Sequence, residues 1–157
     1  GESPVSTAMG AYFNKKAYTD PALRRKYTRM GFWVNIRLIR YPDVLLMAAE
    51  SANEKGLMGE ASGYLEQVRA HARGTLTNVL PKVESLDQSV LREAIRHERR
   101  VELGLEPDRF YDLVRWGIAQ EVLQAAGKNY QPKNALLPLP QTEIDKSNGV
   151  LIQNPDY

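Results

Sequence analysis

The stretch PDVLLMAAESANEKGLMGEASGYLEQVRAHARG, residues 42–74, decides the fold of this chain. Its apolar and small residues recur at spacings of three and four on both sides of Gly56, which is typical of two amphipathic helices joined by a turn. Pro42 suits the first turn of a helix, and Gly56 and Gly74 suit helix ends. The stretch therefore predicts an antiparallel hairpin of two helices, one beginning near Pro42 and the other near Glu60.

This helix pair also fits one tetratricopeptide-like repeat, a helix-turn-helix unit with small residues at fixed places. Ala48, Ala49 and Ala52 come before the turn, and Leu65 and Val68 come after it. One such repeat cannot bury its own apolar face, and about three are needed for a stable stack. Because the chain also begins with glycine instead of methionine, we expect a piece of a longer protein that leaves an apolar helix face uncovered.

Downstream of the hairpin, the apolar spacing predicts two more helices. Ser85 and Gln88 have the spacing of a capping box, so they predict a third helix that runs to about Leu105. A fourth helix is expected to run continuously from Pro107, which suits a helix start, to Gly127, which suits a helix end.

The two ends of the chain have weaker helical patterns. Before the hairpin, the sequence predicts a short helix at residues 19–26 and an extended segment at residues 34–38. The proline-rich tail from residue 136 is expected to be extended, except for one helical turn at residues 142–145. The predicted fold is therefore mainly all-α, with tetratricopeptide-like helical hairpins, long irregular loops and an extended C-terminal tail, in a single domain of residues 1–157.

The composition excludes several classes of function. Twenty-one Lys and Arg residues against 19 Asp and Glu residues leave a formal charge of +2, which is too small to indicate a nucleic-acid partner or an anionic membrane surface. Without cysteine there is no disulfide and no thiolate nucleophile. No apolar run approaches the ~20 residues of a membrane-spanning helix. Motifs for phosphate loops and zinc sites are also missing, so we expect no cofactor and no metal.

The third predicted helix carries carboxylates on its apolar side. Glu98 and Glu102 share one stripe with Leu91, Ile95 and Leu105. A buried carboxylate without a partner is costly, so arginines are expected to meet these two side chains. We therefore predict a structural ion network. Its members are Arg40, Glu98, Arg99, Glu102, Arg109, Asp112 and Arg115.

A catalytic interpretation of these acids competes with the structural one. Glu98 and Glu102, together with Asp108 and Asp112, could form the pair of carboxylates that glycoside hydrolysis needs. Adjacent arginines would keep such carboxylates ionised, whereas a general acid must hold a proton. The structural interpretation is therefore favoured, and we expect no enzymatic activity.

Metal and phosphate sites on the same helix are also weakly supported. Glu93 and His97 are four residues apart, whereas di-iron bundles use a Glu-x-x-His spacing, and His71 is isolated. A second face, with Arg92, Arg96 and Arg100, could touch phosphate, but acidic residues interrupt it and no aromatic residue interleaves with it. A solvated helix face is the favoured interpretation.

The aromatic residues before the hairpin are the candidates for ligand binding. Trp33, Tyr12 and Phe13 lie in the least regular segment of the chain, where loops often carry function. An aromatic ring can stack on the apolar face of a sugar, although core packing is its more common role. These three residues are therefore the candidate glycan-binding residues.

Several segments, in order along nearly the whole chain, resemble the C-terminal domain of the SusD/RagB family. IRYPDVLLMAAE (residues 39–50) resembles the family helix RYADVLLMYAEA, and VRAHAR (residues 68–73) resembles its VRARAG ending. ERRVEL (98–103) followed by DRFYDLVRWG (108–117) resembles its ERRxELxxEGHRFFDLRRWG block. The ends LPLPQTEID and QNPDY resemble LLPIPQxEID and QNPGY. Pro42 and the pair Pro107-Asp108 depart from the family pattern, which puts only local geometry in doubt.

This resemblance implies a non-catalytic lipoprotein of Bacteroidetes polysaccharide-utilisation systems. Such a protein captures an oligosaccharide or another nutrient at the outer-membrane surface and hands it to a SusC-like TonB-dependent transporter. It is held at the membrane only through a lipid anchor, whose cysteine these 157 residues lack. The matched motifs are architectural, so the resemblance assigns no glycan contact to a residue here. A tetratricopeptide-like module for protein–protein interaction remains the alternative.

Overall fold

The computed structural model of the chain describes residues 14, 16 and 37–157. These residues contain six α-helices, the short 3-10 helix η3 and loops, and no strand occurs among them, so the predicted all-α class is confirmed. They belong to two compact units, one that ends at Leu105 and one that comprises Glu106–Tyr157. The prediction of a single domain over residues 1–157 stays a prediction.

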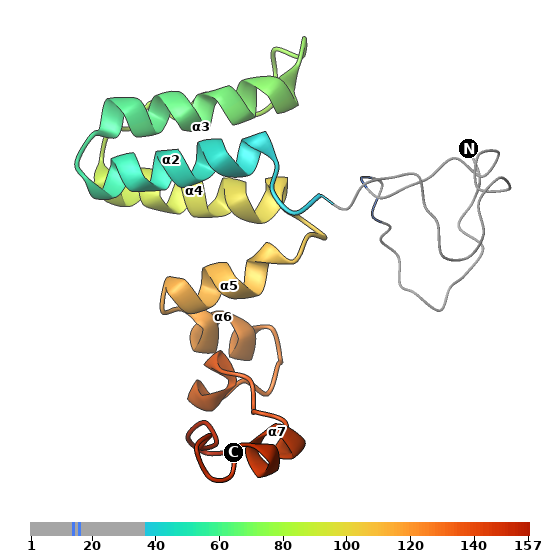
Figure 1. The fold of residues 1–157 in the computed structure, drawn as a ribbon. Helices are drawn as coiled ribbons and strands as arrows, with labels where there is room; N and C mark the ends of the chain where they lie inside the picture. The colour runs from blue at the N-terminus through green and yellow to red at the C-terminus, as the bar shows by residue number, and fades with distance from the viewer. Residues whose placement is uncertain (1–13, 15, 17–36) are drawn as a thin grey trace, which may run out of the picture. The chain divides into compact units, whose positions relative to one another are not determined.

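The described residues of the first unit form a bundle of three helices that lie side by side (Figure 1). Its members are α2 (Tyr41–Glu54), α3 (Met58–Arg73) and α4 (Gln88–Glu102). The predicted hairpin is confirmed, because α2 and α3 run antiparallel across the turn at Gly56, whose φ is +79°. The segment between α3 and α4 then returns the chain along the bundle, so α4 also runs antiparallel to α2 (Figure 1).

The apolar faces of these three helices meet in one core. Each fully buried leucine in such a core contributes ~1.5–3 kcal/mol relative to an exposed one. The buried members are Leu45, Leu46, Ala49, Ala52, Ala61, Leu65, Val68, Leu91 and Ile95. The small alanines on α2 allow the neighbouring helices to approach closely, which explains why α2 packs against both α3 and α4.

The two ends of α4 differ from the prediction. Its N-cap is Asp87, whose carboxylate accepts hydrogen bonds from the backbone N–H groups of Ser89 (2.9 Å) and Val90 (3.0 Å). The capping box predicted from Ser85 was therefore wrong, because the carboxylate of Asp87 takes the helix donors. At the other end the helix stops at Glu102, and Leu105 follows with φ +65° and 63% exposure. Leu105 thus lies outside the apolar stripe to which the spacing assigned it.

The second unit consists of short helices. α5 (Asp108–Arg115) and α6 (Ala119–Ala125) replace the continuous helix predicted for residues 107–127. That prediction was wrong because Gly117 adopts φ +71°, a left-handed conformation that ends one helix before the next begins. Because the apolar spacing continues on both sides of Gly117, the sequence pattern does not reveal this break. A small core forms around the two helices, with Leu113, Ala119 and Tyr130 buried.

The rest of this unit is joined by side chains that bond to the backbone. It contains η3 (Pro132–Ala135) and α7 (Gln141–Lys146), and α7 confirms the helical turn predicted at residues 142–145. The side-chain amide of Gln153 binds both backbone groups of Leu139: Leu139 N–H donates to Oε1 (2.8 Å), and Nε2 donates to the Leu139 carbonyl (2.9 Å). Asn154 Nδ2 donates to the Leu137 carbonyl (2.6 Å). We call this pairing of residues 137–139 with residues 153–154 the C-terminal clasp.

Two predicted elements lie outside the described residues. These are the helix at residues 19–26 and the part of the extended segment at residues 34–36. Within residues 14, 16 and 37–157, no helix combines the length and hydropathy needed to cross a membrane.

Candidate functional site

The three candidate glycan-binding residues, Trp33, Tyr12 and Phe13, lie outside the described residues. Their role therefore stays a prediction. The structure instead places two exposed aromatic side chains on α5 that the sequence reasoning did not single out. Tyr111 is 70% exposed and Phe110 is 37% exposed, with ring centroids 6.1 Å apart in an edge-to-face arrangement. Their adjacency in the sequence was an available signal, because consecutive helical residues project in different directions and a narrow apolar stripe seldom covers both.

Among the acids of the predicted ion network, Glu98 has the most buried carboxylate. Glu98 is 3% exposed, and its Oε2 accepts a hydrogen bond from Arg69 Nη1 on α3 at 2.6 Å. Arg69 was not among the arginines named from the sequence. Its Nη2 also donates to the Pro81 carbonyl (2.9 Å), so one guanidinium joins α3, α4 and the loop between them. A sequence signal for Arg69 was available, because it directly follows Val68, a residue on the apolar face of the second predicted helix.

The other two predicted members on α4 pair with the beginning of α2. Arg99 is 4% exposed and its Nη1 donates to Asp43 Oδ1 at 2.8 Å. Arg40, just before α2, donates to the Glu102 carboxylate at 2.8 Å and to the Glu102 backbone carbonyl at 2.9 Å. Because α2 and α4 are antiparallel, the first turn of one meets the last turn of the other. The charge pairs therefore fix the register between the two helices.

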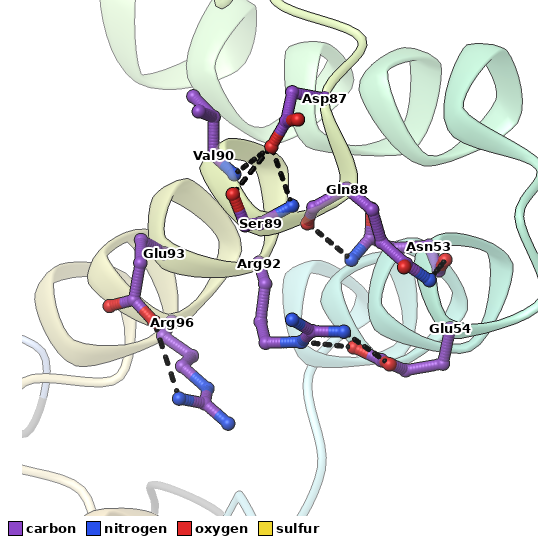
Figure 2. A network of polar contacts seen from close by, with 9 residues as sticks. All are labelled: Asn53, Glu54, Asp87, Gln88, Ser89, Val90, Arg92, Glu93 and Arg96. Carbon is purple, nitrogen blue, oxygen red and sulfur yellow. Dashed lines mark hydrogen bonds and ion pairs between the residues drawn. The ribbon is translucent and has the colours of Figure 1, made fainter.

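A second polar network lies at the opposite end of the same bundle, where α2 ends and α4 begins (Figure 2). Asn53 is fully buried, and its Nδ2 donates to the Gln88 carbonyl (3.0 Å), while Gln88 Nε2 donates to the Asn53 carbonyl (2.7 Å). Arg92 forms two hydrogen bonds with the Glu54 carboxylate, each 2.7 Å long. Both ends of the α2–α4 pair are thus held by polar contacts, with apolar packing between them.

Two carboxylates in this second network have lowered pKa values. The hydrogen bond from Arg92 lowers the pKa of Glu54, and Glu54 in turn raises the pKa of Arg92. The Ser89 hydroxyl, together with the N–H groups of the first turn of α4, lowers the pKa of Asp87. In each case the charged form is favoured by the donors around it. Both acids therefore act as hydrogen-bond acceptors in these contacts.

The members of the network in the second unit lie around one indole ring. Arg115 Nε donates to Asp112 Oδ1 at 2.9 Å, and Asp112 is 4% exposed. The guanidinium groups of Arg115 and Arg109 lie over the Trp116 ring, 4.9 Å and 5.9 Å from its centroid. Cations over the face of an indole are attracted by its quadrupole. These residues therefore tie the last turn of α5 to the residue that follows it.

The geometry of the described residues does not support the competing catalytic and metal interpretations. The two most buried candidate acids, Glu98 and Asp112, each accept a hydrogen bond from an arginine. Glu93 pairs with Arg96 at 3.3 Å, next to the His97 of the metal hypothesis. Within residues 14, 16 and 37–157, no cluster of three or more His, Asp or Glu side chains is arranged to hold a metal ion. The ion pairs of Glu98 and Arg99 instead connect neighbouring helices.

Comparison with known proteins identifies similar chains. Residues 2–135 match the model of the SusD family. Two SusD-like proteins of Formosa agariphila are 39% identical over 153 residues and 36% identical over 127 residues. These matches cover 93% and 76% of this chain but 27% and 25% of those proteins. The chain therefore spans about a quarter of the length of the curated relatives that it matches.

A solved structure shows a similar fold. The crystal structure of a SusD homolog from Bacteroides thetaiotaomicron superposes with a TM-score of 0.69 at 32% sequence identity. The superposition covers 76% of this chain and 26% of that one.

Proposed function

This chain belongs to the SusD family, and we propose that it forms the C-terminal part of a cell-surface protein that binds oligosaccharides. The observation that carries the proposal is the match of residues 2–135 to the family, joined to a superposition on a SusD homolog with a TM-score of 0.69. Membership of this family implies glycan binding at the cell surface. Because the chain spans about a quarter of its relatives, the activity of the whole protein is part of the proposal.

We propose that this protein binds its glycan without turning it over. The acids that a glycosidase would use are engaged with arginines: Glu98 with Arg69, and Asp112 with Arg115. A general acid must present its carboxyl group to the glycosidic oxygen, whereas each of these carboxylates already accepts a hydrogen bond from a guanidinium group. A chromogenic glycoside should therefore not be cleaved, and turnover that Glu98→Gln abolishes would contradict this part of the proposal.

Glycan contacts are proposed for the segment before α2. Trp33, Tyr12 and Phe13 would supply aromatic faces to the sugar. Recognition of a sugar needs such faces together with several polar groups that converge on its hydroxyls. The longer relatives have further chain from which those polar groups can come.

The same proposal includes the partner and the location of the whole protein. A SusC-like TonB-dependent transporter would receive the oligosaccharide, and a lipid anchor elsewhere in the longer protein would hold it at the outer membrane. The C-terminal part would contribute the helical scaffold. Co-purification of the longer protein with a TonB-dependent transporter, from membranes in native expression, is the measurement that tests this partner.

A glycan array followed by calorimetric titration tests the binding proposal. The longer protein should bind an oligosaccharide, and this chain should bind the same glycan more weakly, because a shallow site loses affinity when part of its wall is missing. Trp33→Ala in the longer protein should weaken binding. Tyr111→Ala, which removes a 70% exposed ring from the second unit, is the matched comparison: it should leave affinity unchanged, and weaker binding would instead place the glycan on α5. No binding to any glycan on the array would overturn the proposal.

One observation favours the alternative of a protein–protein interaction module. Tyr41, Val44 and Met47 follow each other at a spacing of three on α2 and are 69%, 43% and 43% exposed. Residues at this spacing share a helix face, and an exposed apolar stripe is a common site of protein association. Sedimentation at increasing concentration would reveal self-association, and Val44→Glu should abolish it if this face is responsible.

A further inference from the structure

The turn after α7 contains an Asn-Gly pair, Asn148-Gly149, which is a chemically reactive sequence. Among the eight asparagines of the chain, Asn148 stands alone in being followed by glycine. The asparagine side chain and the next backbone nitrogen are close enough in the chain to form a five-membered ring, and a glycine in the second position presents that nitrogen without a side chain to shield it. Asparagine is for this reason one of the thermolabile residues of proteins.

The structure leaves this pair accessible. Both Asn148 and Gly149 are exposed, and both have positive φ values, +52° and +83°. Asparagine and glycine tolerate this left-handed conformation better than other residues. A Cβ built on Gly149 would meet no atom within 4 Å. The exposure of both residues therefore gives water and base access to this peptide bond.

We propose that Asn148-Gly149 is a site of spontaneous deamidation and that the isoaspartate formed there opens the C-terminal clasp. The backbone nitrogen of Gly149 loses its proton and attacks the side-chain carbonyl carbon of Asn148. A C–N bond forms, and the side-chain nitrogen leaves as ammonia. Water then adds to one of the two carbonyl carbons of the succinimide and breaks its bond to nitrogen. The products are aspartate or isoaspartate at position 148, and no oxidant or cofactor takes part.

Isoaspartate would disturb the turn because its main chain is one methylene longer. Two hydrogen bonds cross the reacting residue: Val150 N–H donates to the Ser147 carbonyl (3.2 Å), and Leu151 N–H donates to Ser147 Oγ (2.9 Å). Their geometry depends on the length of backbone between donor and acceptor. A longer path therefore breaks or bends both bonds.

The clasp begins two residues beyond this turn. Gln153 reaches Leu139 through two hydrogen bonds of 2.8 Å and 2.9 Å, so its position depends on how residues 150–152 leave the turn. Val150 and Ile152 are 79% and 83% exposed and supply little packing to hold that segment when the turn changes. Deamidation in this exposed turn should therefore release residues 153–154 from residues 137–139.

The experiment follows the purified chain during incubation at neutral and mildly alkaline pH. Peptide mass spectrometry should show the peptide containing Asn148 gaining the mass of an NH-to-O exchange, faster at higher pH. Labelling by a protein isoaspartate methyltransferase should appear in the same peptide. Peptides with the other seven asparagines should change much more slowly. Hydrogen exchange at the Leu139 and Leu151 amides should rise as the product accumulates.

Asn148→Gly provides the matched control, because glycine accepts the same positive φ and has no amide to lose. This variant should gain no mass, take no methyl label and keep slow exchange at Leu139 throughout. Conversion at Asn148 no faster than at Asn129 would overturn the modification site. Conversion with unchanged exchange at Leu139 would overturn the release of the clasp.

Discussion

The two compact units are stabilised in different ways. Among the described residues of the first unit, nine buried apolar residues form one core, and charged pairs such as Glu98–Arg69 are buried with it. In the second unit the core has three buried residues, and much of the remaining order comes from side chains that bond to the backbone, as in the C-terminal clasp. Long amphipathic helices allow the first arrangement, whereas short helices broken by glycine require the second.

This difference indicates where substitutions should be severe and where they should be local. A buried ion pair contributes little net stability, but removal of one partner leaves an uncompensated charge in the core. A hydrogen bond at a partly exposed site contributes only modestly, because water can replace it. The first unit should therefore respond cooperatively to a substitution, and the second should respond near the altered residue.

The largest effect is expected for Glu98→Ala. Arg69, whose side chain is 12% exposed, would lose the carboxylate 2.6 Å away. The free energy of unfolding should fall by ~3–5 kcal/mol, the range for a broken buried pair. Urea denaturation followed by far-UV circular dichroism measures this change.

Two further variants separate charge from packing at this position. The double variant Glu98→Leu with Arg69→Met should recover most of the lost stability, because apolar replacement of a buried pair is often neutral. Glu54→Ala breaks the exposed pair with Arg92 and should change stability far less. A Glu98→Ala variant as stable as the parent chain would show that the pair is not buried in solution.

The next largest effect compares one substitution in both cores. Leu46→Ala should cost ~3 kcal/mol, and Leu113→Ala should lie nearer ~2 kcal/mol, because a small core can collapse more easily around a cavity. Both side chains are almost fully buried, so their exposure does not explain the difference. Residue-resolved hydrogen exchange of the parent chain and of each variant would measure the loss of stability in each unit separately. Equal losses would mean that the two cores are equally rigid.

The sequence predicted the hairpin well and the contacts between helices less well. The spacing around Gly56 is local, so α2 and α3 could be placed from it. Glu98 is buried where the apolar stripe put it, but its partner Arg69 lies on another helix, 29 residues away in sequence. The break at Gly117 was missed because apolar residues recur regularly on both sides of it. The partner of Glu98 is set by a tertiary contact, and the helix break is set by the backbone angle φ of Gly117. Neither can be read from local apolar spacing.

A smaller effect is expected for Asp87→Ala at the start of α4, and it should depend on pH. Donors around Asp87 lower its pKa below the ordinary 3.8. A carboxylate whose pKa is lower in the folded state stabilises that state fully above its unfolded pKa, and this stabilisation is lost as the pH falls through the folded pKa. The parent chain should therefore melt at a higher temperature than the variant at neutral pH.

Melting curves at several pH values test this expectation. The difference in melting temperature should be constant at neutral pH and should shrink below pH 3.8. Asp87→Asn is the matched control, because asparagine also caps helices well but carries no charge. Its difference from the parent chain should be smaller than that of the alanine variant. A difference that grows on acidification would contradict the assigned cap.

The smallest and most local effect is expected for Gln153→Glu in the second unit. The glutamate can still accept the N–H of Leu139, but it has no donor for the Leu139 carbonyl, which Gln153 Nε2 contacts at 2.9 Å. One hydrogen bond of this kind contributes ~0.5–1.5 kcal/mol, and the new negative charge would face an oxygen. Amide exchange at Leu139 should increase, while exchange in α2, α3 and α4 stays unchanged. Gln120→Glu, on the exposed first turn of α6, adds the same charge outside the clasp and should leave Leu139 protected. If Gln153→Glu instead lowered protection throughout the three-helix unit, the clasp would be part of a larger cooperative structure, and the contrast between the two units would fail.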